Sequence, residues 1–235
     1  MPPRANIKEP EPDKAKRIVC NPSGEKEISV PLFTEDKETC RFYSGEEIET
    51  VFNNVALRKG IKSISDIKMP IVIPTVDVQN SKKYIITNHI PERPSRNTEY
   101  INNISIGKAI RASSSFPVVF NPCEYKTHKF LDGGILDNVP AQEIKLQGAN
   151  KVIAINFKAD EINNQSTVMD IAMRSIDIMG NKVSEESLGA SDMVLTIETD
   201  KTGLLEIEKL DECYKYGYRG TMEKMNEILK IINQK

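Results

Sequence analysis

"KFLDGGILDNVPAQEIKLQGANKVIAINF", residues 129–157, holds the transitions that decide the fold. A short apolar run ends at Asp132 and is followed by two glycines. "NVPAQEIKLQG" then predicts a helix with Pro140 near its start and Gly148 as its C-terminal stop. "NKVIAINF" is apolar and β-branched, which is typical of a strand buried on both faces. Strands that alternate with helices in this way indicate an α/β domain with a largely parallel sheet.

The segments upstream continue the alternation. The apolar spacing of "SGEEIETVFNNVALRKG", residues 44–60, predicts a helix, and "ISIGKAIRASSSFP", residues 104–117, predicts a short one capped by Ser105. Between them, "MPIVIPTVDVQNSKKYIITN" predicts two strands joined by a turn at residues 79–82. Pro70 and Pro74 indicate that the first of these strands is an edge strand or is broken.

The C-terminal third predicts a further crossover. Residues 167–189 have the pattern of a long amphipathic helix, and "DMVLTIE", residues 192–198, that of a buried strand. The last helix places Met222, Met225, Leu229 and Ile232 on one face, which we interpret as core packing, with lipid contact as the alternative. The fold class predicted for the chain is therefore an α/β three-layer sandwich with a mainly parallel sheet.

Composition limits the classes of function. The 235 residues carry a formal net charge of −2, which favours no nucleic acid partner. The four cysteines are far apart and the chain has only two histidines, so we expect neither a disulfide framework nor a metal site. We see no transmembrane segment and no signal peptide, and we expect a cytoplasmic protein. Residues 1–17, rich in proline and charge, predict a flexible N-terminal arm.

Taken alone, Asp132-Gly133-Gly134 predicts a turn, because Asp and Gly favour turn conformations. A second interpretation is that the carboxylate of Asp132 faces a reactant. Glycines beside it would then remove the Cβ atoms that block a close approach.

The neighbouring residues favour the second interpretation. "IGKAIRASSSFPVVFNPCEYKTHKFLDGGILDNVPAQEIKLQGANKVIAINF" resembles the patatin-like phospholipase family throughout, and the resemblance extends over roughly residues 40–235. The ordered features that carry it are Arg111–Ser115, Pro117, Phe120–Pro122, Asp132–Gly134, Asn138–Pro140 and Gly148–Ala149.

The resemblance implies a chemistry. Patatin-like enzymes are lipid acyl hydrolases with a Ser-Asp dyad, in which a serine of a G-x-S-x-G motif attacks the ester and the aspartate of D-G-G or D-G-A is its base. A glycine-rich loop nearer the N-terminus binds the oxyanion. On this resemblance Asp132 is the general base, Gly133 and Gly134 give the nucleophile room, and burial raises the pKa of the carboxyl group. The implied substrate is a lipid ester, and no cofactor or metal is implied.

No nucleophile is found, because the chain has no G-x-S-x-G motif and no glycine-rich loop. Ser105 and Ser187 have only a downstream glycine, and Ser23 and Ser44 lack an upstream one. The serines at 113–115 match a family segment that is not the nucleophile.

We therefore expect residues 18–235 to be the C-terminal portion of a patatin-like domain, incomplete at its N-terminus and inactive alone. "NKVIAINF" has no charge between Lys151 and Lys158 to protect an open sheet edge, so we expect it to need a missing N-terminal half or to associate through that edge. One alternative is a non-catalytic remnant or lipid-binding module on the same scaffold. Another is an unrelated α/β protein in which the glycines only form a turn.

Three further residues are weaker candidates. We interpret His128 as a surface histidine beside two lysines, not as part of a Ser-His-Asp site. Asp137 is interpreted as a cap or turn residue, and Asp77 as a polar residue at a strand end.

Overall fold

The computed structural model describes residues 17–18, 28–29, 43–117, 119–157, 168–199 and 209–233. The chain forms two compact units, Met1–Thr39 and Cys40–Lys235. In the first, β1 (Arg17–Ile18) pairs antiparallel with β2 (Ile28–Ser29). The predicted arm, residues 1–17, lies outside the described residues except for Arg17. The second unit contains the candidate site.

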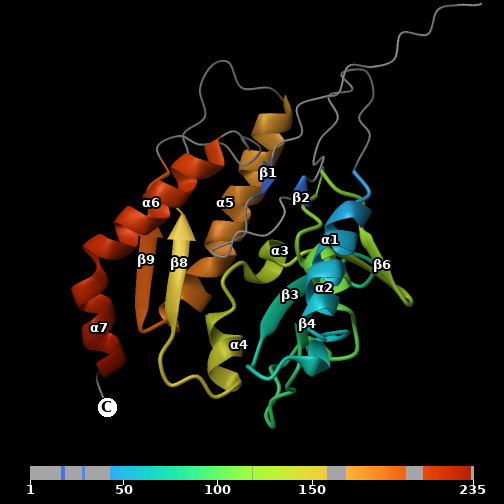
Figure 1. Cartoon of the computed structure of the whole chain (residues 1–235), viewed down its shortest axis with the longest axis horizontal. Coiled ribbons are helices and arrows are strands. Elements are labelled where there is room, and N and C mark those ends of the chain that lie inside the picture. Colours follow the sequence, from blue (N-terminus) through green and yellow to red (C-terminus); the bar gives the residue numbers. More distant parts are fainter. Residues whose placement is uncertain are drawn as a thin grey trace, which may run out of the picture. The chain divides into compact units, whose positions relative to one another are not determined.

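The second unit contains a mixed sheet of five strands (Figure 1). Its strands are β3 (Val72–Asp77), β4 (Lys82–Thr87), β5 (Thr98–Ile101), β6 (Cys123–Tyr125) and β7 (His128–Asp132), in the order β5-β4-β3-β7-β6. The α/β class is confirmed, but β4 and β5 pair in parallel while the other neighbours are antiparallel. A tight turn joins β3 to β4, as predicted, and a second one joins β6 to β7, so this sheet is mainly antiparallel and not mainly parallel as predicted.

The position predicted for β3 is wrong. It is the middle strand, with β4 on one side and β7 on the other, although it contains Pro74. The register with β7 runs from Thr75↔Asp132 to Asp77↔Phe130. At Pro74 the strand therefore has β4 as its neighbour but has passed the end of β7. A proline is tolerated in an internal strand where one ladder has already ended.

Two helices predicted from the sequence form as expected and pack on each other. They are α1 (Glu46–Arg58) and α2 (Ile106–Ser113). Ser105 caps α2, because its hydroxyl accepts the Lys108 N–H at 3.3 Å. The two helices come so close that a Cβ on Gly107 would lie 2.0 Å from the carbonyl oxygen of Glu49. The absence of a side chain at Gly107 sets how tightly α2 packs.

Helices cover both faces of the five-stranded sheet. On one face, Thr75 Oγ1 lies 3.2 Å from the carbonyl oxygen of Ala112 in α2. Val76 points to the opposite face, as does its cross-strand partner Lys83. Lys83 contacts α3 (Gly134–Asp137) and α4 (Ala141–Leu146), which places these helices on that second face. Helix, sheet and helix form the three layers predicted from the sequence.

The buried core lies between the sheet and α2. Its fully or nearly buried members are Ile64, Tyr84, Ile86, Ile104, Ala109, Ala112, Cys123 and Phe130. Ile64 belongs to the 3-10 helix η1 (Ile64–Asp66). This core fixes β7, which leads to Asp132, against α2.

The C-terminal part is a parallel β-α-β unit with two added helices (Figure 1). Its elements are β8 (Ile153–Phe157), α5 (Val168–Gly189), β9 (Met193–Ile197), α6 (Leu210–Glu223) and α7 (Met225–Asn233). The long helix predicted for residues 167–189 is confirmed by α5. Helix α6 packs on β9, where a Cβ on Gly220 would lie 2.7 Å from Ile197 Cδ1.

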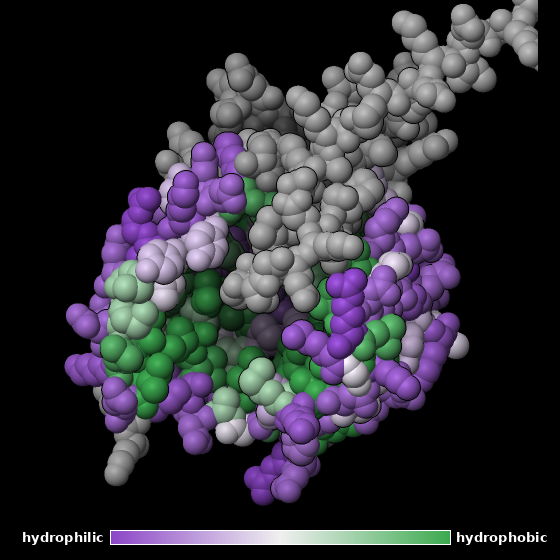
Figure 2. All heavy atoms as spheres, viewed as in Figure 1, coloured by the Kyte–Doolittle hydropathy of each residue, from purple (hydrophilic) through white to green (hydrophobic). Residues whose placement is uncertain are grey.

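Two burial predictions for this part are wrong. Ile155 and Phe157 of β8 are 56% and 60% exposed, so β8 is not buried on both faces. Phe157 pairs with Ile197, so the two side chains lie on the same face of the two-stranded sheet. The helix on that face, α6, packs against β9. Val194 is 41% exposed, so β9 is buried on one face only. Figure 2 shows apolar side chains gathered over the region of β8, β9 and α7.

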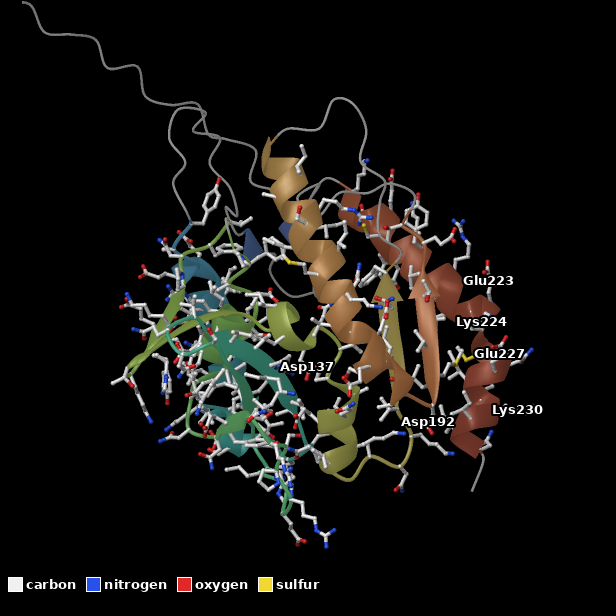
Figure 3. The ribbon with its side chains drawn as sticks, turned by 180° about the vertical axis from the view of Figure 1, so that it is seen from behind. Asp137, Asp192, Glu223, Lys224, Glu227 and Lys230 are labelled. Atoms are coloured by element: carbon white, nitrogen blue, oxygen red, sulfur yellow. The ribbon has the colours of Figure 1, made fainter. Side chains whose placement is uncertain are left out.

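The last helix also differs from the prediction. It is divided at Lys224 into α6 and α7, and Met222, Leu229 and Ile232 are exposed instead of packed in a core. Glu223, Lys224, Glu227 and Lys230 lie along the same helices (Figure 3). Within the described ranges, no helix combines the length and the apolarity needed to cross a bilayer.

Candidate functional site

Asp132 is the last residue of β7, at the strand end predicted from the sequence. Its backbone N–H donates to the Ser115 carbonyl at 3.0 Å, and the Gly133 N–H donates to the Ser113 carbonyl at 3.4 Å. On the other side Asp132 is in register with Thr75 of β3. The strand end is therefore held between the middle strand and the C-terminal end of α2.

The carboxylate of Asp132 is held by the chain that follows it. Its Oδ1 accepts the Gly134 N–H at 2.7 Å, which is the hydrogen bond of an Asx turn. Burial raises the pKa of Asp132, while this hydrogen bond acts in the opposite direction. The turn and the presented carboxylate, which the sequence left as alternatives, are thus compatible. A carboxyl group with a raised pKa is better suited to accept a proton near neutrality.

The glycines have a packing role within the chain itself. A Cβ on Gly133 would lie 2.3 Å from the carbonyl oxygen of Pro74, so β3 already occupies the space beside it. A Cβ on Gly134 would lie 3.0 Å from Asp132 Oδ1 and 3.1 Å from Asn138 Oδ1. Room for a nucleophile, the role implied by the family resemblance, remains a prediction.

No serine hydroxyl in the part of the chain that the structure describes is hydrogen-bonded to Asp132. The hydroxyls of Ser114 and Ser115 donate to helix carbonyls four residues back, at 2.8 and 2.7 Å. Ser187 Oγ donates to the Val139 carbonyl and accepts the Ala141 N–H. Ser44 accepts the Glu46 N–H, and Ser105 caps α2; Ser23 lies outside the described residues.

A buried charged cluster next to the site was missed by the sequence analysis. Lys83 Nζ lies 2.9 Å from Asp137 Oδ2 and 2.9 Å from Glu143 Oε1. Tyr100 donates its hydroxyl to Glu143 Oε2 at 2.9 Å. Burial by itself lowers the pKa of Lys83, but the two carboxylates outweigh it and the pKa is raised. We call these four residues the Lys83 cluster.

Asp137 therefore does not have the cap or turn role predicted for it. It is buried at the end of α3 and forms an ion pair with a strand residue (Figure 3). The two partners are 54 residues apart in the sequence, so no local pattern could have revealed the pair.

His128 is not a simple surface histidine either. Its Nδ1 lies 2.7 Å from Asp77 Oδ2, its side chain is 26% exposed, and its ring stacks on Phe130 with a centroid distance of 5.4 Å. Asp77 ends β3, as predicted. Burial alone raises the pKa of Asp77, but hydrogen bonds from His128, Gln79 and Lys129 outweigh it and the pKa is lowered. The pair joins the end of β3 to the start of β7 in the β6–β7 hairpin.

Comparison with known proteins bears on the segment that carries this geometry. Residues 41–144 match the family model of the patatin-like phospholipases. This segment is patatin-like. It includes Asp132 and the Lys83 cluster and ends before β8. The family resemblance inferred from the sequence is confirmed for residues 41–144, and its extension to residue 235 stays a prediction.

Two curated proteins to which this chain is similar are fungal. The lysophospholipase NTE1 of Meyerozyma guilliermondii is 28% identical in an alignment of 138 residues that covers 46% of this chain and 10% of the relative. The lysophospholipase NTE1 of Candida albicans is 28% identical in an alignment of 137 residues that covers 47% of this chain and 10% of the relative. The matched part thus spans about a tenth of the length of these relatives.

Proposed function

We propose that this chain supplies the general base of a patatin-like acyl hydrolase that acts on a lipid ester. The observation that carries the proposal is the carboxylate of Asp132, which ends β7 inside the family-matched segment and is mostly withdrawn from water. The names of the relatives, both lysophospholipases, favour a lysophospholipid as the ester.

The proposed reaction has two steps. A serine hydroxyl attacks the ester carbonyl and transfers its proton to the Asp132 carboxylate, and the alcohol leaves with a proton from the aspartic acid. Water then attacks the acyl-serine ester and gives a proton to Asp132; the bond to the serine oxygen breaks, that oxygen takes the proton back from Asp132, and the fatty acid is released. Backbone N–H groups must stabilise the oxyanion in both steps. Neither the serine nor those donors is identified in this chain, so we propose that another segment provides them.

The C-terminal strands offer a place for such a segment. Among the described residues, β8 pairs with β9 and with no other strand. Parallel sheets are normally covered on both faces, yet Ile155 and Phe157 are more than half exposed. We propose that a strand of the nucleophile-bearing segment pairs with β8 and that its helix covers these two side chains.

A second candidate function is a non-catalytic lipid-binding module. The observation in its favour is the set of exposed apolar and aromatic side chains on α6 and α7. Its members are Leu210, Tyr214, Tyr218, Met222, Leu229 and Ile232. Such a module would bind lipid vesicles without help from a second segment and would never hydrolyse an ester.

An esterase assay separates the two candidates. The chain alone is expected to hydrolyse a short-chain nitrophenyl ester no faster than the solvent does. The chain combined with a patatin-like segment that carries G-x-S-x-G is expected to be active, and Asp132→Asn then lowers kcat by roughly 10²–10⁴-fold. Asp211→Asn, an exposed carboxylate on α6, is the matched control and keeps full activity. Full activity of the Asp132→Asn protein would remove this residue from the mechanism.

A further inference from the structure

We propose that Asp137, held by Lys83, is a positioning residue for Asp132: the ion pair fixes α3, and α3 presents the Gly134 N–H to the Asp132 carboxylate. The inference rests on the proposed function only where it treats Asp132 as a base. The hydrogen-bond geometry that carries it does not depend on catalysis.

The Lys83 cluster connects four elements on one face of the sheet. Lys83 comes from β4 and Tyr100 from β5, while Asp137 and Glu143 come from α3 and α4. Glu143 is 1% exposed, and both of its carboxylate oxygens have partners, Lys83 Nζ and the Tyr100 hydroxyl, each at 2.9 Å. The Tyr100 oxygen in turn accepts the Ser95 N–H at 3.1 Å. A buried cluster with its hydrogen bonds satisfied holds its members in one arrangement.

The link from the cluster to the candidate base is short. Helix α3 begins at Gly134, whose N–H donates to Asp132 Oδ1 at 2.7 Å, and ends at Asp137, whose Oδ2 lies 2.9 Å from Lys83 Nζ. Within the helix, the Asp137 N–H donates to the Gly133 carbonyl at 2.8 Å. A four-residue helix has too few internal hydrogen bonds to hold its own position. Its two ends are held instead by Asp132 and by Lys83.

A second contact sets the height of α3 above the sheet. A Cβ on Gly180 of α5 would lie 3.0 Å from the carbonyl oxygen of Gly134, so α5 lies directly against the start of α3. Contact with α5 and the ion pair to Lys83 therefore both restrain α3. The ion pair is the part that a single substitution can remove without disturbing α5.

Asp137 can affect the pKa of Asp132 in two ways that have opposite signs, so a titration can tell them apart. Burial raises the pKa of Asp132 and the Gly134 N–H lowers it. Removing the negative charge of Asp137 would lower the pKa of Asp132 if the charge acted only through space. Losing the Gly134 hydrogen bond would raise it. Asp137→Ala removes both the charge and the tie to Lys83, so the direction of the change identifies the mechanism.

The experiment is an NMR titration of the Asp132 carboxyl carbon in the full chain. In Asp137→Ala we expect the pKa of Asp132 to rise by about one to two units, the value of one hydrogen bond to a charged group. Asp137→Asn keeps an oxygen that can accept from Lys83, and we expect it to restore most of the wild-type value. Glu99→Gln, which removes an exposed carboxylate paired with Lys82, is the charge control and leaves the value unchanged.

A fall or no change in Asp137→Ala would overturn the proposal, and so would an equal rise in Asp137→Asn. The Lys83–Glu143 pair remains balanced in Asp137→Ala, which favours folding. If that protein does not fold, Asp137→Ser is titrated in its place, because its hydroxyl is too short to reach Lys83. Full ester hydrolysis by Asp132→Asn would contradict the proposed function, but it would not alter these titrations.

Discussion

Substitution of Gly133 by alanine tests the packing that surrounds the candidate base. The new Cβ would lie 2.3 Å from the Pro74 carbonyl oxygen, 2.6 Å from its carbonyl carbon and 2.8 Å from its Cβ. The first two are backbone atoms of the middle strand, so relief requires β7 and β3 to separate by most of an ångström. Forced overpacking of this kind costs roughly 1–3 kcal/mol. We expect the urea midpoint of Gly133→Ala to fall accordingly.

The matched control is Gly217→Ala in α6, where a Cβ would have no heavy atom within 4 Å. Alanine is preferred over glycine inside a helix, so this variant should gain roughly 0.5–1 kcal/mol in the free energy of unfolding. Unfolding in urea is followed by circular dichroism. An unchanged slope of the free energy of unfolding against urea concentration checks that the two-state fit applies. A Gly133→Ala protein as stable as the wild type would refute the close approach of Pro74 and restore the idea that the glycine leaves open space.

Three other substitutions follow from the same structure. The folded-state pKa of Asp132 is raised, so its ionisation costs stability as the pH rises through that pKa; Asp132→Asn should be more stable than the wild type at pH 7, and the difference should vanish below about pH 4. The folded-state pKa of Asp77 is lowered, so its ionised carboxylate stabilises the fold above the unfolded-state pKa, and this stabilisation is lost as the pH falls through the folded-state pKa. Asp77→Asn should therefore be less stable than the wild type at pH 7, and the difference in the free energy of unfolding should shrink below about pH 4. Urea unfolding at several pH values tests both predictions. An Asp132→Asn protein less stable than the wild type at pH 7, or an Asp77→Asn protein more stable than it, would contradict the corresponding prediction. Gly107→Ala places a Cβ 2.0 Å from the Glu49 carbonyl oxygen and should lose roughly 1–3 kcal/mol, whereas Gly189→Ala, in open space, should lose nothing.

The candidate site was predictable only where its signals are local. The end of β7 at Asp132 and the helices capped by Ser105 and stopped at Gly148 follow from residues next to each other in the sequence. The Lys83 cluster depends on a register that brings β4 beside α3, and no short stretch records that register. Charged residues in sequence are usually solvated, so Asp137 gave no sign of burial.

The fold was predicted in class but not in its strand arrangement, for a related reason. Pro74 is a local signal for an edge strand, yet its effect depends on where β7 ends, which is decided 58 residues away at Asp132 and Gly133. The apolar run of β8 indicated a strand correctly. Its burial could not be read from the run, because burial depends on which helices pack over Ile155 and Phe157.

The pairing of β3 with β7 has a consequence for the order in which the chain folds. The β3–β4 and β6–β7 hairpins join residues that are near in sequence, whereas Thr75 Oγ1 donates to the Leu131 carbonyl across 56 residues. Closing so long a loop costs more chain entropy than forming a hairpin, and contacts of this range slow folding. We expect both hairpins to form first and the pairing of β3 with β7 to form last. The carboxylate of the candidate base would then become buried only in that final step. Any substitution that delays the pairing of β3 with β7 would keep this carboxylate exposed to water until the pairing forms.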